Sequence, residues 1–440
     1  MSTISNNNYY YSVSTIRQVL DMSINNLIEN KDFHVRQIGK DFTRNRKVGC
    51  KTLIELMLRL SSKTIQSDLM DFFDSVEDMP TASAVCQQRA KLSYTAFQRI
   101  FHQFTTYFNN YKTYNGYFLL ACDGSDINIA YNPKDSSTHH RNNSAKGFNQ
   151  LHLNALFDVL NCVYMDVNID TATKTRECGA LGDMIIDHNY PANSIIICDR
   201  GYEKYNLIAV CIEKNQKFII RVKDINSNGI LSGYGLPDEA FDTVITKKVT
   251  RLQTKETKSE KEYSILMNGT PFDYLPIDQD YYEMKFRVVR FKITDDTYEC
   301  LITNLTEEEM KFEEFKDIYH LRWGIENAFR DLKYTIGMLY FHSANQELIK
   351  QEIYCSLIVY NFSQLVINNT PPEQESTWKY KYRSNFKTAV TNVRLYLRER
   401  IDEDELAKRI KKFLIPIRPG RTYGRNVKPQ SSKTSSYYAA

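Results

Sequence analysis

The sequence lacks several features that would assign it to a class at once. Its nine cysteines are scattered, odd in number and form no Cys-x-x-Cys pair, which argues against a disulfide framework or a structural zinc site. The N-terminus, rich in Asn, Ser and Tyr, has no basic start followed by an apolar run, so it does not look like a signal peptide. The most apolar late stretch, residues 353–367, is interrupted by Asn361, Ser363 and Gln364, which excludes a membrane span there. A cytoplasmic protein of a reducing compartment is expected.

The chain as a whole also lacks a large excess of either positive or negative charge. The net charge of +4 is too weak to argue for nucleic-acid binding, so the distribution of charge has to decide. Six cations gather within residues 36–51, and no acidic residue follows Glu405, although Lys and Arg continue to Lys433. A tail of one sign in an intracellular protein often contacts phosphate.

The pattern of apolar residues changes twice along the 440 residues of the chain, a length that allows two or three domains. Apolar residues recur at helical spacing in the first quarter, which is compatible with helix-turn-helix DNA binding and also with helix pairs that bind no DNA. Strands and helices then alternate, as in an α/β mixed sheet, until a run of β-type segments without helical period. The predicted organisation is a disordered N-terminus (1–15), a helical DNA-binding domain (16–112), the first part of a catalytic core (113–223), a β-rich insertion (224–303), the second part of the core (304–367), and a basic helical C-terminal region with its tail (368–440).

Two aspartates follow buried strands at corresponding places. Asp123 follows the apolar run 118–122, and Asp199 follows the run 195–198. A carboxylate is costly to bury unless it is paired or binds a metal, and neighbouring parallel strands would bring the two side by side at the edge where open sheets place active sites. Read singly, Asp123 is a turn residue before Gly124 and Asp199 is a helix cap.

A third element is one helix predicted over residues 319–333. At about 100° per residue, polar side chains fall within an arc of roughly 80°, while an apolar face fills the adjoining arc. The helix would deliver Glu326 as a third oxygen ligand, and a set of three carboxylates selects Mg²⁺ or Mn²⁺ over zinc. The alternative is a solvated face with salt bridges three and four residues apart. The polar arc holds Tyr319, Arg322, Glu326, Arg330 and Lys333.

These pieces together resemble the DDE transposases of the insertion-sequence-four group of bacterial mobile elements. The resemblance rests on Asp123-Gly124-Ser125, on Asp199-Arg200-Gly201-Tyr202 and on the spacing Tyr-x2-Arg-x3-Glu-x6-Lys, which is intact from Tyr319 to Lys333. It covers residues 117–345 well and the flanks by layout only. It implies an RNase H-like mixed-sheet core with a β-rich insertion, flanked by helical N- and C-terminal regions.

The resemblance also implies an activity, cofactors and partners. Asp123, Asp199 and Glu326 would be catalytic and would bind two Mg²⁺ ions, for which Mn²⁺ can substitute, to cut and rejoin DNA at the ends of an insertion sequence through a hairpin. The expected partners are double-stranded DNA, as terminal inverted repeats and target, and a second copy of the chain in a homodimer on DNA. The expected location is the bacterial cytoplasm, at the nucleoid when bound to DNA. No membrane partner is expected.

Further side chains are assigned around that centre. Tyr319, Arg322 and Lys333 would grip phosphates near the cleaved end, since guanidinium and ammonium groups donate to phosphate oxygens. Trp323 would stack on an unstacked base or pack against another element. Arg330 shares the polar arc but lies outside the family pattern, so its DNA contact is an open question.

Two other functions and five other residues stay open at this point. The chain could be a nuclease of the same fold that cuts without rejoining, or a DNA-binding protein derived from a transposase. Asp126 is expected to be structural, because it would face the opposite side of its strand from Asp123. Side chains that could support the site or contact DNA are Asp158, Glu177, His152 and His320.

Overall fold

The structure is a computed structural model that describes residues 4–5, 10–61, 63–73, 75–142, 145–171, 176–275, 279–295, 297–418 and 436–437. Most of the basic tail predicted to contact phosphate lies outside these residues. Within them, no helix is both long enough and apolar enough to cross a membrane.

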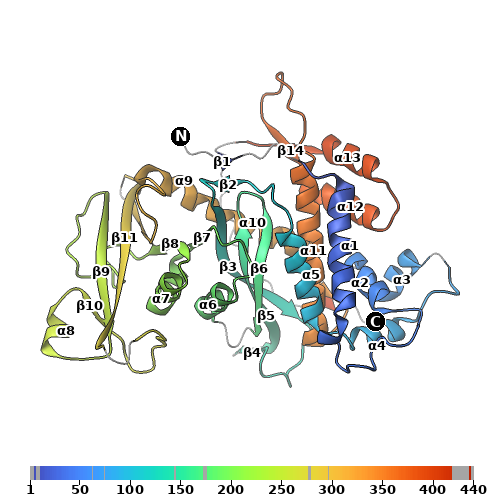
Figure 1. The fold of residues 1–440 in the computed structure, drawn as a ribbon, viewed down its shortest axis with the longest axis horizontal. Helices are drawn as coiled ribbons and strands as arrows, with labels where there is room; N and C mark the ends of the chain where they lie inside the picture. The colour runs from blue at the N-terminus through green and yellow to red at the C-terminus, as the bar shows by residue number, and fades with distance from the viewer. Residues whose placement is uncertain are drawn as a thin grey trace.

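Within the described residues, ten strands form one mixed sheet, which extends from the end of the molecule at the left of Figure 1 to its middle. The parallel part pairs β3 with β7 and β7 with β8, while β5 is antiparallel to β3, to β4 and to β6. The strands, in order of pairing, are β10 (Tyr263–Ile265), β9 (Phe241–Thr250), β11 (Tyr281–Thr294), β12 (Thr297–Thr303), β8 (Lys217–Val222), β7 (Ser194–Cys198), β3 (Phe118–Ile129), β5 (Ala145–Asp158) and β4 (His139–Asn142), with β6 (Val163–Thr171) also on β5.

The central strands are apolar at successive positions because both faces of the sheet are covered. Ile195 and Ile197 of β7 pack with Phe315 and Ile318 on one face, whereas Ile196 packs into the larger core on the other. Successive side chains of a strand point to opposite faces, so a strand covered on both sides is apolar throughout. The continuous run that predicted a buried strand thus follows from helices on both sides.

The segment predicted as a β-rich insertion extends the same sheet. β12 pairs with β8, β11 with β12, and β9 with β11, all antiparallel. Leu301 of β12 lies opposite Arg221 of β8. A short helix, α8 (Lys255–Ser259), occupies the charged turn between β9 and β10. The insertion therefore continues the sheet from the edge of β8.

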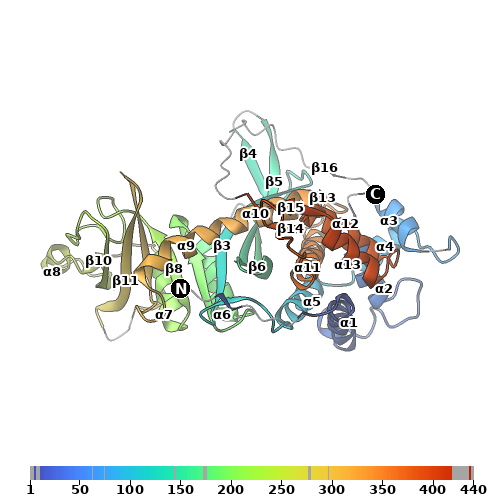
Figure 2. The ribbon, with the colours of Figure 1, turned by 90° about the horizontal axis from the view of Figure 1, so that it is seen from above.

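Two sets of helices cover the two faces of the sheet (Figure 2). One face carries α6 (Glu177–Asp187) and α7 (Tyr205–Glu213). The other carries a continuous helical segment made of α9 (Phe315–His320), a 3₁₀ turn η5 (Leu321–Trp323), α10 (Gly324–Asp331) and a π-helical turn η6 (Leu332–Ile336). The single regular helix predicted over 319–333 is therefore wrong in detail, because its pitch changes at both ends of α10. Gly337, at φ 98°, ends the segment in a conformation that favours glycine.

The helical N-terminal region packs on α11 (Gln346–Asn369), much of which is buried. Its first helix begins at Val13, inside the segment predicted to be disordered, because the Ser12 hydroxyl accepts from the Thr15 amide and caps it. The helices are α1 (Val13–Glu29), α2 (Cys50–Arg59), α3 (Ile65–Phe72), α4 (Ala82–Arg89) and α5 (Tyr94–Thr106). After α11 follow α12 (Phe386–Leu397) and α13 (Glu403–Lys412).

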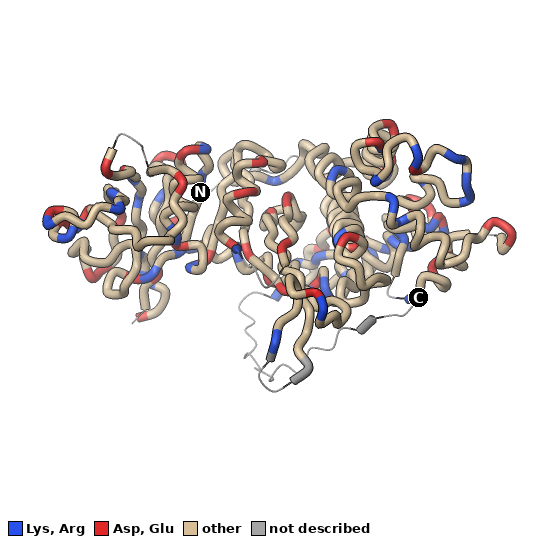
Figure 3. Tube along the Cα trace, turned by 90° about the horizontal axis from the view of Figure 1, so that it is seen from below, with Lys and Arg blue, Asp and Glu red and all other residues tan. Residues whose placement is uncertain are grey.

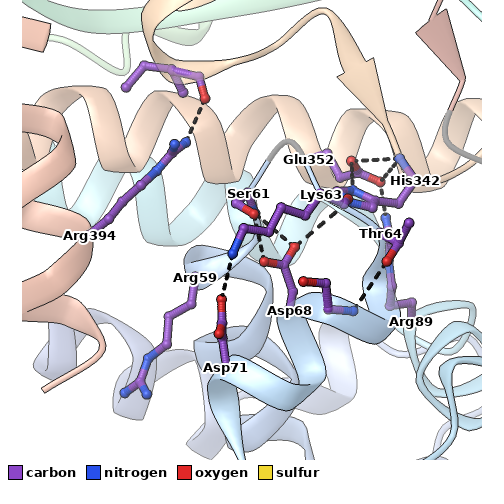
Figure 4. A network of polar contacts seen from close by, with 12 residues as sticks. Arg59, Ser61, Lys63, Thr64, Asp68, Asp71, Arg89, His342, Glu352 and Arg394 are labelled. Atoms are coloured by element: carbon purple, nitrogen blue, oxygen red, sulfur yellow. Dashed lines mark hydrogen bonds and ion pairs between the residues drawn. The ribbon is translucent and has the colours of Figure 1, made fainter. Parts of the chain in front are cut away.

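A buried polar network joins the N-terminal helices to α11 (Figure 4). Arg89 of α4, with a side chain 1% exposed, donates to Glu352 of α11 at 2.7 Å. His342 lies 3.0 Å from the other oxygen of Glu352 and 2.7 Å from the Lys63 carbonyl oxygen. Both of these partners accept, so the imidazole is protonated, and Glu352 raises its pKa against the effect of burial.

Part of the basic C-terminal region also serves this interface. Arg398 contacts Asp68 at 3.4 Å and Asp71 at 3.2 Å, and Arg394 donates to the Ile336 carbonyl oxygen at 2.6 Å. Arg394 of α12 and Arg398, which follows that helix, therefore have internal partners.

Candidate active site

The two predicted aspartates lie on neighbouring parallel strands. Cys122 of β3 pairs with Cys198 of β7, and Asp123 and Asp199 are the next residues on each. The prediction that Asp123 ends its strand is wrong, since β3 continues to Ile129 along β5. β7 stops at Cys198, however, so Asp123 lies where the parallel pairing ends, and the expected juxtaposition follows from that end.

Backbone amides orient both carboxylates. The Gly124 amide donates to Oδ1 of Asp123 at 2.9 Å, and the Gly201 amide donates to Oδ1 of Asp199 at 2.8 Å. The second bond caps a 3₁₀ turn, η3 (Arg200–Tyr202), so Asp199 fulfils the capping role read from its sequence as well as lying at the site. Each carboxylate keeps one oxygen free of these bonds for another ligand.

Glu326 reaches the same place from α10. The buried side chains Ile325, Ala328 and Phe329 fix this helix to the core, which confirms the predicted apolar face. Glu326 is 39% exposed at its side chain and lines a pocket of about 470 Å³ together with Asp199. Three carboxylates thus come from two strands and one helix.

The electrostatics of Asp123 show that the three acids act on one another. Burial, together with the charges of Asp199 and Glu326, raises the pKa of Asp123 to about 6, although the Gly124 amide and Arg322 lower it. Carboxylates that repel one another in this way fit a divalent cation, which relieves the repulsion. In the described part of the chain no group of three or more His, Cys, Asp or Glu side chains forms a ready-made metal site. The three carboxylates thus suit a divalent cation by their oxygen donors and their like charge, and they do not form a preassembled set of ligands.

Tyr319 and Arg322 are more deeply placed than a helix edge suggests. They are 3% and 4% exposed, and the Arg322 guanidinium lies 5.9 Å from the Tyr319 ring centroid and 3.9 Å from Oε1 of Glu326. The Arg322 Nε is buried without a hydrogen-bond partner in the structure. Burial raises the pKa of Tyr319 to about 12 although Arg322 opposes it, so its hydroxyl stays protonated at neutral pH. A buried cation with an unused donor beside the acids is available to an anionic ligand.

Lys333 lies in the turn η6, directly after α10, and contacts β3. Its ammonium donates to Oγ of Ser125 at 2.8 Å and to the Asp126 carbonyl oxygen at 2.7 Å. Lys333 belongs to the π-helical turn η6, and such turns are frequent at functional sites. Its contact with DNA phosphate stays a prediction, and the structure adds a second role in fixing β3.

Of the two remaining residues predicted to contact DNA, Trp323 lines the pocket and Arg330 does not. Trp323 is 43% exposed, lines the pocket, and has the Arg322 guanidinium 4.8 Å from its ring centroid. Arg330 is exposed and is not among the residues that line the pocket. Both contacts stay predictions, of which the pocket supports that of Trp323.

Three cations at the pocket escaped prediction. Arg200, Arg221 and Lys223 line it with Arg322, so four cations surround two carboxylates. Arg221 is held by Glu299 of β12 at 2.8 Å. Arg200 could have been found, because it adjoins Asp199. The other two could not, because only the register of β8 beside β7 brings them to this edge.

The other weighed residues have structural partners. Asp158 caps the turn after β5 by accepting from the amides of Leu160 and Asn161. Asp126 pairs with His152, as expected of a structural residue, and His152 also contacts Glu177. His320 is exposed at the end of α9.

Comparison with known proteins adds a family. Residues 115–362 match a protein-family model described as a transposase DDE domain. A probable transposase for insertion sequence element IS5377 of Geobacillus stearothermophilus is 21% identical over 196 residues, which is 44% of each chain, so this chain matches less than half the length of that relative. A cryo-EM structure of a piggyBac transposase synaptic complex with hairpin DNA aligns with 96% of this chain and 89% of that chain, at 11% identity and a TM-score of 0.42, too low to establish a shared fold.

Proposed function

We propose that this chain, which belongs to the family of transposases with a DDE domain, cuts DNA at the ends of an insertion sequence and rejoins it elsewhere. The observation that carries the proposal is the meeting of Asp123, Asp199 and Glu326 beside a cationic pocket. We assign the chain to the insertion-sequence-four group on the intact spacing from Tyr319 to Lys333, and with it the cut-and-paste route through a hairpin.

The catalytic core is proposed to be RNase H-like. Support comes from the strand order β6-β5-β3-β7-β8, in which β5 alone runs against the others. The aspartates lie on the two central parallel strands of that order, at the edge where the carboxyl ends of parallel strands bind ligands.

Asp123, Asp199 and Glu326 would hold Mg²⁺, with Mn²⁺ as a substitute. Two ions supply activation of the attacking water or 3′-hydroxyl and stabilisation of the leaving oxygen. The amides of Gly124 and Gly201 keep Asp123 and Asp199 oriented before any ion arrives.

The cations of the pocket would hold the DNA strand against the acids. Arg322 has a buried donor to offer a phosphate oxygen, and Arg200, Arg221 and Lys223 surround the opening. Trp323 offers an exposed ring to a base that leaves the stack. Because each phosphate contact releases counterions, several such contacts should make the affinity for DNA fall steeply as the salt concentration rises.

The N-terminal helical region is proposed to bind double-stranded DNA as well. Figure 3 shows Lys and Arg recurring along the helical end of the molecule, at the right of the view. There, a pocket of about 320 Å³ is lined by Lys40, Arg44, Arg46 and Lys91, with no acid among its lining residues. Two such regions in a homodimer would hold the two terminal repeats of one element.

The test is cleavage and strand transfer by the full chain on a labelled transposon end in Mg²⁺. Wild type should give both products, and Glu326→Gln should give neither while still binding the DNA. Asp317→Asn, an exposed change on the same helical segment, is the matched control. Cleavage without strand transfer would indicate a nuclease, binding without cleavage would indicate a DNA-binding derivative, and full activity of Glu326→Gln would refute the site.

A further inference from the structure

We infer that His152 is a positioning residue that braces the segments carrying Asp123 and Asp199, and that Glu177 is its partner in doing so. The inference rests on the proposed function, because it concerns how the acids are held for their metal ions. Neither side chain lines the pocket, so both act through their neighbours.

His152 links three elements from a buried position. It lies on β5 directly opposite Asp126 of β3, and it is 5% exposed. Its Nδ1 lies 2.8 Å from Oδ1 of Asp126, and its Nε2 lies 3.2 Å from Oε1 of Glu177, the first residue of α6. The first contact is a hydrogen bond, and the second is an ion pair without full hydrogen-bond alignment.

The ring packs directly against the residue after the first aspartate. A Cβ at Gly124 would lie 2.4 Å from Nε2 of His152 and 2.8 Å from Oε1 of Glu177, closer than real Cβ atoms approach. Glycine is therefore required at 124 by its neighbours, since its φ is not positive. The amide of this same Gly124 donates to Asp123, so the position of the ring determines where that donor lies.

Glu177 extends the brace to the second aspartate. Its Oε2 lies 3.9 Å from where a Cβ of Gly201 would stand, and the Gly201 amide donates to Asp199. His152 and Glu177 thus fill the space behind both amide donors that orient the acids.

His152 places a positive charge between two partly exposed carboxylates. Burial lowers its pKa, but Asp126 and Glu177 outweigh burial and raise it to about 9. Both nitrogens then carry protons for two carboxylates. Without that cation, Glu177 would add a further negative charge beside acids that already repel one another.

The experiment measures Mn²⁺ binding to the full chain by electron paramagnetic resonance, together with the Mg²⁺ concentration for half-maximal cleavage. His152→Gln keeps one donor and loses the charge. We expect its Mn²⁺ affinity to fall by about 10–100-fold, as for partners that orient metal ligands. His102→Gln is the matched control, because His102 forms a similar pair with Asp166 at 2.8 Å and is not among the neighbours of Gly124 or Gly201.

A merely structural His152 would lower the yield of folded protein and leave the affinity of that folded protein unchanged. If His152→Gln does not fold, Asp126→Asn decides, since it weakens the hold on the ring from a half-exposed carboxylate and should weaken Mn²⁺ binding in the same direction. Unchanged Mn²⁺ affinity in the folded variant would overturn the inference. If wild type binds Mn²⁺ but shows no cleavage, the proposed function fails instead.

Discussion

The raised pKa of Asp123 makes a prediction about the stability of the metal-free protein. Its folded-state pKa of about 6 lies above the ordinary value of 3.8 because burial and two neighbouring acids disfavour the carboxylate. Between these two pH values the folded state binds more protons than the unfolded state, so stability falls as the pH rises from about 4 to about 6. The cost is fully present at pH 8 and largely absent below pH 4.

The size of the effect follows from the same values. A difference of roughly two units between the folded and unfolded pKa lowers the free energy of unfolding by at most about 3 kcal/mol at pH 8. About a third of that destabilisation remains at pH 4.5. The carboxylate keeps some contact with solvent, so we expect about 1–2 kcal/mol in practice. Asp123→Asn removes the titrating group and keeps its size, so it should stabilise the metal-free protein at pH 8 and do so much less at pH 4.5.

The assay is denaturant unfolding of wild type and Asp123→Asn after EDTA treatment, at both pH values. A change in packing would alter the free energy of unfolding equally at both pH values, so the difference between the two stabilisations reports the titration of Asp123 alone. Adding Mg²⁺ at pH 8 should then stabilise wild type more than Asp123→Asn, since a ligand of the folded state stabilises it by mass action. Asp317→Asn should show neither effect. A stabilisation that is equal at both pH values would refute the argument.

Three further predictions concern other parts of the molecule. Arg89→Met should lower the free energy of unfolding by about 3 kcal/mol in chemical denaturation, because it leaves Glu352 buried without its main partner, and a loss below about 1 kcal/mol would contradict this. Lys333→Met should abolish cleavage while costing about 2 kcal/mol of stability for its two lost bonds, and retained cleavage would show that the lysine only fixes β3. Changing Arg221 and Lys223 together to Ala should reduce the slope of log affinity for DNA against log salt by about 2 in fluorescence anisotropy, and an unchanged slope would remove both from the interface.

The local sequence pattern was sufficient to predict features that depend on a single helix or strand. The apolar run before Asp199 predicts a strand, and the apolar face of α10 is confirmed by the burial of Ile325 and Phe329. The pitch changes at η5 and η6 were not predictable, because the apolar spacing differs little between an α-helix and a short π or 3₁₀ turn. The end of β3 was misplaced because Gly124 suggests a turn, whereas it is required by the ring packed against it.

Arg322 shows how the insertion and the helix depend on each other. From the helix alone, its guanidinium belongs on a solvated edge, yet it is 4% exposed. One charge of the insertion acts on it: burial raises the pKa of Glu299 of β12, and the cations Arg221 and Arg322 oppose this. This glutamate is close because the insertion extends the catalytic sheet beyond β8, a pairing that local pattern does not specify. A carboxylate that already serves Arg221 at 2.8 Å leaves the Nε of Arg322 without a partner. A buried guanidinium with an unused donor is the condition that favours an incoming phosphate.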